Sequence, residues 1–219
     1  MSAKEGPAFC TTAERLNTLL AGSRQAPLES ALANRFAEFS ALLLRWNARV
    51  NLTAIRDEET ILSRHFVESI ACARALPDEI GTLLDFGSGA GFPGVPIALC
   101  RPEIAVTLAE SQGKKAAFLQ EAVRVVGISA KVHSGRAEKL GATFDCVTLR
   151  AVDQMKQAVK AAAWLVRPGG WVALMTTASD LVWLQSAAGE SYTWQNSIAL
   201  PGGESRILAL GQRALNSSA

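Results

Sequence analysis

Residues 81 onward alternate short apolar runs with segments of helical periodicity, and this alternation is the strongest constraint on the fold. The apolar runs span 82–86, 104–109, 130–133, 144–149 and 171–176. Helical segments follow them near 93–100, 113–126, 153–166 and 179–188. Strands that are apolar on both faces and separated by helices indicate a parallel sheet covered on both sides. The sequence therefore predicts an α/β fold with five parallel strands.

The last part of the chain has a different pattern. The strand-like runs 192–200 and 206–210 are joined through Pro201-Gly202-Gly203. A connection this short suits a hairpin and is too short for a crossover. We expect an antiparallel hairpin after the parallel strands.

The first 80 residues carry helix signals and no strand signals. Thr11 with Glu14 fits a capping box that opens a helix through Leu20. Apolar residues spaced by three or four positions predict a second helix over 28–46 and a third over 58–76. We interpret residues 1–80 as a helical extension that packs on the sheet-containing unit, residues 81–219. We expect the two parts to form one compact body.

Composition narrows the class of protein. The chain has 219 residues, 49% hydrophobic and 19% charged, with a formal net charge of +2. No uncharged apolar run reaches the ~18 residues of a membrane span, and polar residues occupy the N-terminus where a secretory signal needs an apolar core. The sequence predicts a cytoplasmic protein with no membrane contact.

The cysteines give no sign of a metal site. Cys10, Cys72, Cys100 and Cys146 lie far apart without a CxxC pair, and the chain has only two histidines. We interpret the cysteines as free thiols and expect no bound metal.

A glycine-rich turn follows the first predicted strand. Asp85 ends that strand, and Gly87, Gly89 and Gly91 follow at alternate positions, which lets backbone approach a ligand closely. A dinucleotide fingerprint needs glycine at the sixth position of the loop, where this chain has Phe92. The turn indicates a nucleotide-type cofactor other than a dinucleotide.

The next two strand ends add polar residues. Glu110 ends the second strand, where an acid can accept hydrogen bonds from both ribose hydroxyls, in NAD enzymes and methyltransferases alike. Gly135-Arg136-Ala137-Glu138 follows the third strand and is placed to read an adenine edge. Taken alone, Glu110 could also be an ordinary surface glutamate, and residues 135–138 could be an ordinary helix-capping loop.

Together these segments resemble the RsmG (GidB) family of bacterial methyltransferases over nearly the whole chain. The most specific matches are Trp46-Asn47 and Gly91-Phe92-Pro93-Gly94. Glu68 stands where the family favours aspartate, which keeps the carboxylate. Further matching segments are Asn51-Leu52-Thr53, Arg64-His65, Glu110-Ser111, Gly113-Lys114-Lys115, Phe118-Leu119, Phe144-Asp145 and Arg150-Ala151.

The resemblance implies a Rossmann-like fold of the class I S-adenosylmethionine-dependent methyltransferases. It implies methyl transfer from S-adenosylmethionine to N7 of a guanine in 16S ribosomal RNA, guanine 527 of that RNA. The resemblance further implies that the substrate is the RNA itself or the small ribosomal subunit. The family's cofactor contacts fall on Gly87, Phe92, Ala137, Glu138 and Arg150.

Guanine N7 attacks with a free lone pair and loses no proton, so catalysis needs positioning and electrostatics rather than a base. Arg150, at the end of the fourth strand, is the candidate catalytic residue. Its planar guanidinium suits the methionyl carboxylate or a target phosphate. The structural alternative is an internal pair with Asp145 or Asp153.

Basic residues supply the predicted RNA contacts. His65 lies in an otherwise apolar helical stripe, so it is either a satisfied core residue or a group that contacts a base. Candidates to follow an RNA backbone are Lys114, Lys115, Arg136, Arg45 and Arg64.

Two other functions fit parts of the sequence. One is a small-molecule methyltransferase in which the helical extension closes an apolar pocket. The other is a non-catalytic RNA-binding factor of ribosome assembly, which has no physical need for Asp85, the three loop glycines and Glu110 together. We expect the protein to be a monomer.

Overall fold

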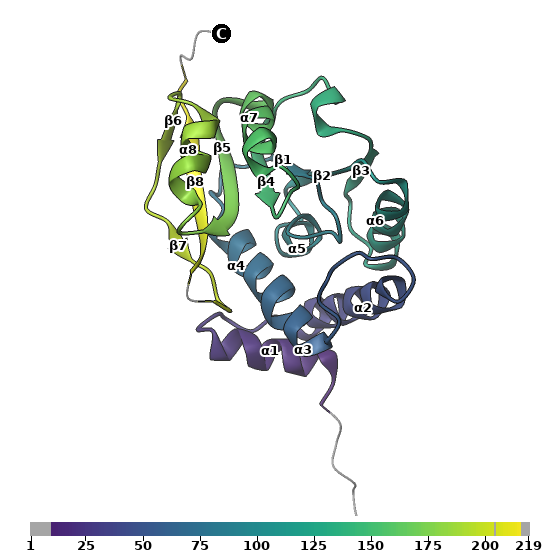
Figure 1. The fold of residues 1–219 in the computed structure, drawn as a ribbon. Coiled ribbons are helices and arrows are strands. Elements are labelled where there is room, and N and C mark those ends of the chain that lie inside the picture. Colours follow the sequence, from purple (N-terminus) through teal and green to yellow (C-terminus); the bar gives the residue numbers. More distant parts are fainter. Residues whose placement is uncertain (1–9, 204, 216–219) are drawn as a thin grey trace, which may run out of the picture.

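The central element is a mostly parallel sheet. The computed structural model describes residues 10–203 and 205–215, and these form an eight-stranded sheet in the order β3-β2-β1-β4-β5-β8-β6, with β7 paired to β8 (Figure 1). β1 to β5 pair in parallel, which confirms the predicted five-stranded core. Their bounds are β1 Thr82–Phe86, β2 Ala105–Glu110, β3 Lys131–Ser134, β4 Phe144–Arg150 and β5 Val166–Thr177.

The antiparallel addition is present and differs in detail from the expected hairpin. β8 (Arg206–Arg213) runs antiparallel to β5 and lies between β5 and β6 (Tyr192–Trp194). β7 (Ile198–Ala199) also pairs with β8. The predicted run 192–200 is divided because its middle, Gln195-Asn196-Ser197, is exposed and consists of polar residues that include the turn formers Asn and Ser.

Helices cover both faces of the sheet, as the apolar strands require. α5 (Gly94–Cys100) and α6 (Gly113–Val125) pack on the face where Leu83 points. α7 (Met155–Leu165) and α8 (Leu181–Ala188) pack on the face where Leu84 points. Neighbouring strand residues therefore enter opposite cores, as the period of two dictates.

The N-terminal helices form a layer outside α5 and α6 (Figure 1). α1 (Thr12–Gly22) begins at the predicted capping box: the Thr11 N–H donates to Glu14 Oε2 (2.7 Å), and the Glu14 N–H donates to Thr11 Oγ1 (3.2 Å). α2 (Ser30–Asn47) buries Phe36 and Phe39 against the core.

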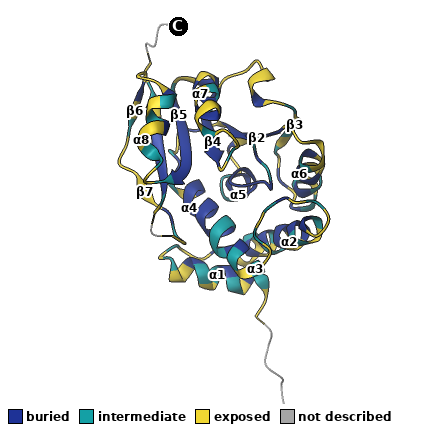
Figure 2. Ribbon diagram, in the orientation of Figure 1, coloured by how far each residue is buried: buried dark blue, intermediate teal, exposed yellow. Residues whose placement is uncertain are grey.

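The predicted third helix is a continuous run with a widened turn inside it. α3 (Glu58–Ile61) leads into a π-helical turn (Leu62–Val67), and α4 (Glu68–Ala75) follows. Figure 2 shows α4 and α5 largely buried where the layer meets the sheet. π turns occur frequently at functional sites.

The boundary that we predict at residue 80 falls in the connection between α4 and β1. An aromatic cluster crosses this boundary. Phe92, from the glycine turn, lies 5.3 Å from Phe39 and 5.1 Å from Phe66 between ring centroids. The division into two parts stays a prediction, and the chain ends at 1–9 and 216–219 lie outside the described residues.

The start of α5 requires glycine because the backbone there touches β1 and β2. A Cβ on Gly94 would lie 2.3 Å from Leu108 Cδ2 and 2.5 Å from Asp85 Oδ2. Gly22, at the end of α1, has no atom within 4 Å of the same position.

We expect Gly94→Ala to lower the free energy of unfolding by about 1–3 kcal/mol, because buried neighbours must move. The matched control Gly22→Ala should raise it by about 0.5–1 kcal/mol, because alanine favours the helix. Urea unfolding of both variants measures the difference. Equal effects from the two substitutions would show that the close approach at Gly94 carries no strain.

Candidate active site

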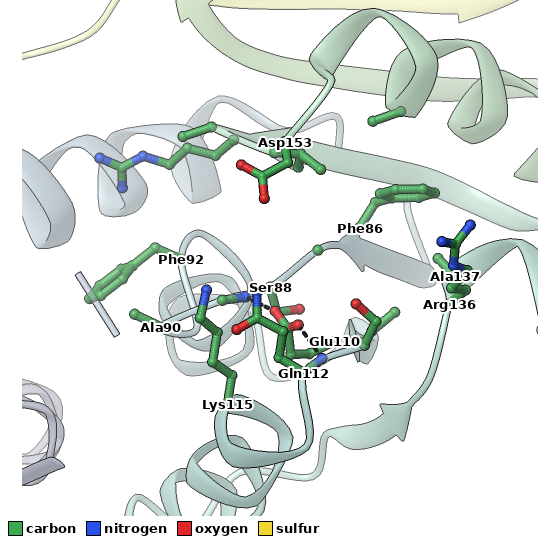
Figure 3. A pocket seen from close by; sticks show the side chains of 18 of the residues that line it. Phe86, Ser88, Ala90, Phe92, Glu110, Gln112, Lys115, Arg136, Ala137 and Asp153 are labelled. Carbon is green, nitrogen blue, oxygen red and sulfur yellow. Dashed lines mark hydrogen bonds between the residues drawn. The ribbon is translucent and has the colours of Figure 1, made fainter. Parts of the chain in front are cut away.

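A cavity of about 590 Å³ opens at the carboxyl ends of β1, β2 and β4 (Figure 3). This edge is where open α/β sheets bind their ligands. The loops after β1, β2, β3 and β4 line it, and the helical layer adds Leu52, Thr53 and His65. Both parts of the chain therefore build one site.

The glycine turn forms the floor of the cavity. Gly87, Ser88, Gly89, Ala90 and Phe92 line it. Gly87 has φ +71°, and a Cβ there would lie 3.2 Å from Val152 Cγ2 in the neighbouring loop after β4, so the turn depends on the absence of a side chain.

Asp85 and Gly91 do not line the cavity. The buried Asp85 carboxylate accepts hydrogen bonds from Thr148 Oγ1 (2.9 Å) and the Gly94 N–H (3.1 Å). Burial raises the pKa of Asp85 to about 6, which these hydrogen bonds partly oppose. Asp85 thus fastens the end of the turn to β4 and leaves ligand contact to its neighbours.

Glu110 is a buried carboxylate at the cavity wall. Oε2 accepts from the Gly89 N–H (2.9 Å), and Oε1 accepts from the Gln112 N–H (2.7 Å). Each carboxylate oxygen has a further lone pair. Glu110 therefore orders the glycine turn and keeps acceptor capacity for a ligand hydroxyl.

The loop after β3 closes the next side. Gly135, Arg136, Ala137 and Glu138 line the cavity, and the Gly135 N–H donates to the Glu110 carbonyl (2.9 Å). This bond joins the β3 loop to the end of β2. Glu110, at the end of β2, and Glu138, in the loop after β3, consequently line the same cavity.

Arg150 lines the cavity, and its guanidinium is bound to the helical layer. Nη2 donates to the Arg64 carbonyl (2.7 Å) and Glu68 Oε2 (3.0 Å), and Nη1 donates to Ser69 Oγ (3.3 Å). Burial lowers the pKa of Arg150 to about 10, which leaves it charged at neutral pH. Neither Asp145 nor Asp153 is its partner, so the structural alternative, an internal pair with one of these two acids, is wrong.

The reason is geometric. Asp145 lies near the start of β4, the end remote from Arg150, where it accepts from the Gly81 N–H (2.9 Å) and the Thr82 N–H (2.8 Å) and pairs with Arg167. Asp153 lies after the strand and is exposed. Glu68 meets Arg150 from across the boundary between the two parts.

Comparison with known proteins identifies the family of the chain. The profile of the family GidB, rRNA small subunit methyltransferase G, matches residues 32–194. The ribosomal RNA small subunit methyltransferase G of Stenotrophomonas maltophilia (strain K279a) is 44% identical over 156 residues, 70% of this chain and 73% of the relative. The chain belongs to the rRNA small subunit methyltransferase G family. The predicted family and the predicted enzyme class, a methyltransferase, are confirmed.

Solved structures show the same fold at low sequence identity. A putative O-methyltransferase from Klebsiella pneumoniae has a TM-score of 0.58 and 16% identity, covering 90% of this chain and 95% of its own. TYW2 of M. jannaschii, solved in complex with AdoMet, has a TM-score of 0.53 and 12% identity, covering 68% and 74%. The predicted class I methyltransferase fold is confirmed.

The predicted RNA-binding residues divide into two groups. Lys115 and Arg136 line the cavity, whereas Lys114, Arg45 and Arg64 lie outside its lining. Lys114 and Arg45 are exposed. Arg64 donates through Nε to Glu68 Oε1 (3.1 Å), so it belongs to the ion pairs behind the cavity wall.

The structure adds lining residues that sequence reasoning did not select. Thr53 enters the cavity because Asn47 folds the loop before it: Asn47 Oδ1 accepts from the N–H groups of Leu52 and Thr53 at 3.0 Å each. The segments Trp46-Asn47 and Asn51-Leu52-Thr53, which match the family, were the available signal.

Ala151 and Gln154, after β4, adopt φ of +49° and +52°. This backbone strain was not predictable from any sequence pattern. Also in the lining are Ser111, Gln112, Val152, Asp153 and Gln157.

The described residues hold no cluster of ligands for a metal ion, and none of their helices is long and apolar enough to cross a membrane. The cysteines are free. Cys146 is buried in β4 outside the cavity lining, and burial raises the pKa of its thiol well above the ordinary value. Because the thiol does not reach the cavity, Cys146 is not positioned to attack a substrate there.

His65 stacks on Phe92 at the cavity wall, with centroids 5.0 Å apart. Its Nδ1 lies 3.0 Å from Arg150 Nη2, and its Nε2 lies 2.9 Å from Thr53 Oγ1. Arginine only donates, so Nδ1 accepts and Nε2–H donates to the threonine. Burial, with Arg150, Arg64 and Arg206 nearby, lowers the pKa of His65 to about 3. The imidazole is neutral and has a partner at each nitrogen.

Stability should therefore depend on pH through His65. In the unfolded chain this histidine takes up a proton near its ordinary pKa of 6.5, while the folded protein resists protonation down to about 3. The free energy of unfolding should fall as pH drops through this window, by up to about 1.4 kcal/mol per pH unit. Urea unfolding of the wild type and His65→Gln from pH 7 to pH 4 measures this contribution as a difference.

His133→Gln, which removes a histidine outside the cavity lining, is measured beside it as the matched control. Asp85 contributes the opposite slope below about pH 6, and it does so in all three proteins. A His65→Gln variant with the same acid slope as the wild type would contradict the assignment of a buried neutral imidazole.

Proposed function

We propose that the protein transfers a methyl group from S-adenosylmethionine to N7 of a guanine in 16S ribosomal RNA, guanine 527 by the family resemblance. The observation that carries the proposal is the cavity at the carboxyl ends of β1, β2 and β4, in a chain that belongs to a family of ribosomal RNA methyltransferases. We place the protein in the cytoplasm, where this RNA is modified.

The cavity fits the cofactor in size and in donor set. Ligand pockets usually measure about 300–1,000 Å³, and this one measures about 590 Å³. We assign the ribose hydroxyls to Glu110, the close backbone approach to Gly87 and Gly89, and the adenine side to Ala137 and Glu138. Phe92 forms the apolar wall, and Arg150 is assigned to the methionyl carboxylate. Asp85 and Gly91 support the turn from behind.

When bound, S-adenosylmethionine supplies a methyl group on a positively charged sulfur. Guanine N7 is a neutral nucleophile that holds no proton, so the protein has to orient the base and needs no proton acceptor. The neutral His65 bonds at both nitrogens, so it serves the geometry of the wall and not proton transfer. Arg150 is the residue on which we expect orientation to depend most.

RNA would approach over the basic residues at the cavity. Lys115 and Arg136 line it, and Lys114 and Arg45 are exposed outside the lining. Each phosphate contact releases counterions, so RNA affinity should fall with salt with a slope of about 0.7–0.9 per contact. A small apolar substrate, as in the alternative methyltransferase function, would bind with little salt dependence. A factor of ribosome assembly without catalysis would bind RNA and leave it unmodified.

Mass mapping of 16S ribosomal RNA after incubation with the protein and S-adenosylmethionine tests the reaction. We expect one 7-methylguanosine, and about a hundredfold slower transfer with Arg150→Ala, because a misplacement of about 1 Å costs that much. Glu58→Gln, an ion-pair variant in the helical layer, should keep the wild-type rate. Methylation of an exocyclic amine, or none in either free RNA or assembled subunits, would contradict the proposal.

Glu110→Ala tests the cofactor site. Loss of a charged hydrogen-bond acceptor should weaken S-adenosylmethionine binding about tenfold to a hundredfold, corresponding to about 1.5–3 kcal/mol. Calorimetry measures the dissociation constant, with Glu38→Ala, an exposed acid on α2, as the control. NAD should not displace the cofactor. Unchanged affinity in folded Glu110→Ala would rule out this placement.

A further inference from the structure

Glu68, the first residue of α4, is completely buried and receives three arginines from three parts of the chain. Its Oε1 accepts from Arg64 Nε (3.1 Å), and its Oε2 accepts from Arg150 Nη2 (3.0 Å) and Arg206 Nη2 (3.5 Å). Arg64 lies in the π turn, Arg150 ends β4 and Arg206 begins β8. A buried carboxylate without such partners would be strongly unfavourable.

The remaining acceptors of Arg150 come from the same short segment. The Arg64 carbonyl and His65 Nδ1 share Nη2 with Glu68, while Ser69 Oγ and the His65 carbonyl (3.5 Å) accept from Nη1. The hydrogen-bond acceptors of this guanidinium among the described residues therefore all lie between residues 64 and 69. Glu68 is the only one of them that carries charge.

Among the residues that the structure describes, the charges around Glu68 leave a positive excess at the cavity wall. Three guanidiniums face one carboxylate, and His65 adds no charge because its pKa is about 3. Of the three arginines, Arg150 lines the cavity. An anionic group in the cavity thus meets an arginine whose direction is set from behind by Glu68.

We propose that Glu68 is a positioning residue, which holds the Arg150 guanidinium in the direction from which it binds the carboxylate of the methionine part of S-adenosylmethionine. This inference rests on the proposed function. It makes the helical layer part of the cofactor site, because the sheet alone supplies no carboxylate to Arg150. Glu68 needs no contact with the cofactor to act in this way.

A double-mutant cycle on cofactor affinity tests the proposal. Calorimetry gives the dissociation constant of S-adenosylmethionine for the wild type, Glu68→Gln, Arg150→Gln and the double variant. We expect Glu68→Gln to raise it about tenfold and the double variant to match Arg150→Gln within about twofold, since coupled residues are not additive. Glu68→Asp, which keeps the charge with a shorter reach, should recover part of the affinity.

Two controls separate positioning from general damage. Glu58→Gln removes a carboxylate that pairs with Arg15 elsewhere in the helical layer (2.8 Å) and should leave cofactor affinity unchanged. Affinity of Glu68→Gln for RNA without cofactor should stay within about twofold of the wild type, about 0.4 kcal/mol. If Glu68→Gln does not fold, Glu68→Asp enters the same cycle.

Two results overturn the proposal: a wild-type dissociation constant in Glu68→Gln, or effects of the two substitutions that multiply in the double variant. Wild-type protein that yields 7-methylguanosine while the cycle is multiplicative refutes this inference and leaves the proposed function standing. Wild-type protein that binds S-adenosylmethionine with a coupled cycle and methylates another atom refutes the proposed function alone.

Discussion

A buried guanidinium is the constraint on which the rest of the site depends. Arg150 ends a central strand and is 8% exposed, and a charge so placed is tolerable only if its donors find acceptors. None of the hydrogen-bond acceptors that the structure shows for Arg150 belongs to the sheet. They come from the π turn and the first residues of α4, so the helical layer cannot move away from β4 without leaving a buried charge unpaired. The layer and the sheet consequently close together and share one cavity.

The apolar side of the same contact is formed by Phe92. Its ring leaves the glycine turn and packs among Phe39, Phe66 and His65. Pyrophosphate recognition needs glycine at this position, so the bulky ring excludes that mode of binding and connects the turn to the helical layer. Phenylalanine in place of glycine at position 92 therefore affects both the class of ligand that the turn can bind and the residues against which the turn packs. Aromatic pairs contribute about 0.5–1.5 kcal/mol beyond their buried area, which favours a single position of the turn.

Local patterns in the sequence were sufficient for most of the fold. Short, continuously apolar runs predicted the parallel strands. Apolar residues spaced by three or four positions and the Thr11 capping box predicted the helices, and the strand ends brought Gly87 and Glu110 to one cavity. Partners far apart in sequence were not predictable in this way. Arg150 and Glu68 are 82 positions apart and meet only because two layers pack, so the sequence offered only the nearer acids Asp145 and Asp153 as an internal alternative. The π turn between α3 and α4 is likewise invisible to a helical period.

In the proposed reaction, methylation at a ring nitrogen moves positive charge from sulfur to the base and changes no protonation state. A site for this reaction therefore works best with charges that stay constant across the physiological range. Arg150 stays protonated with a pKa of about 10, and His65 stays neutral with a pKa of about 3. Burial lowers the pKa of both groups. The positive charge of Arg150 lowers the pKa of His65 further. The acid sensitivity of the fold and the pH dependence of the chemistry should accordingly have different origins, because His65 stabilises the cavity wall, whereas in the proposed reaction the guanine nitrogen reacts without a proton partner.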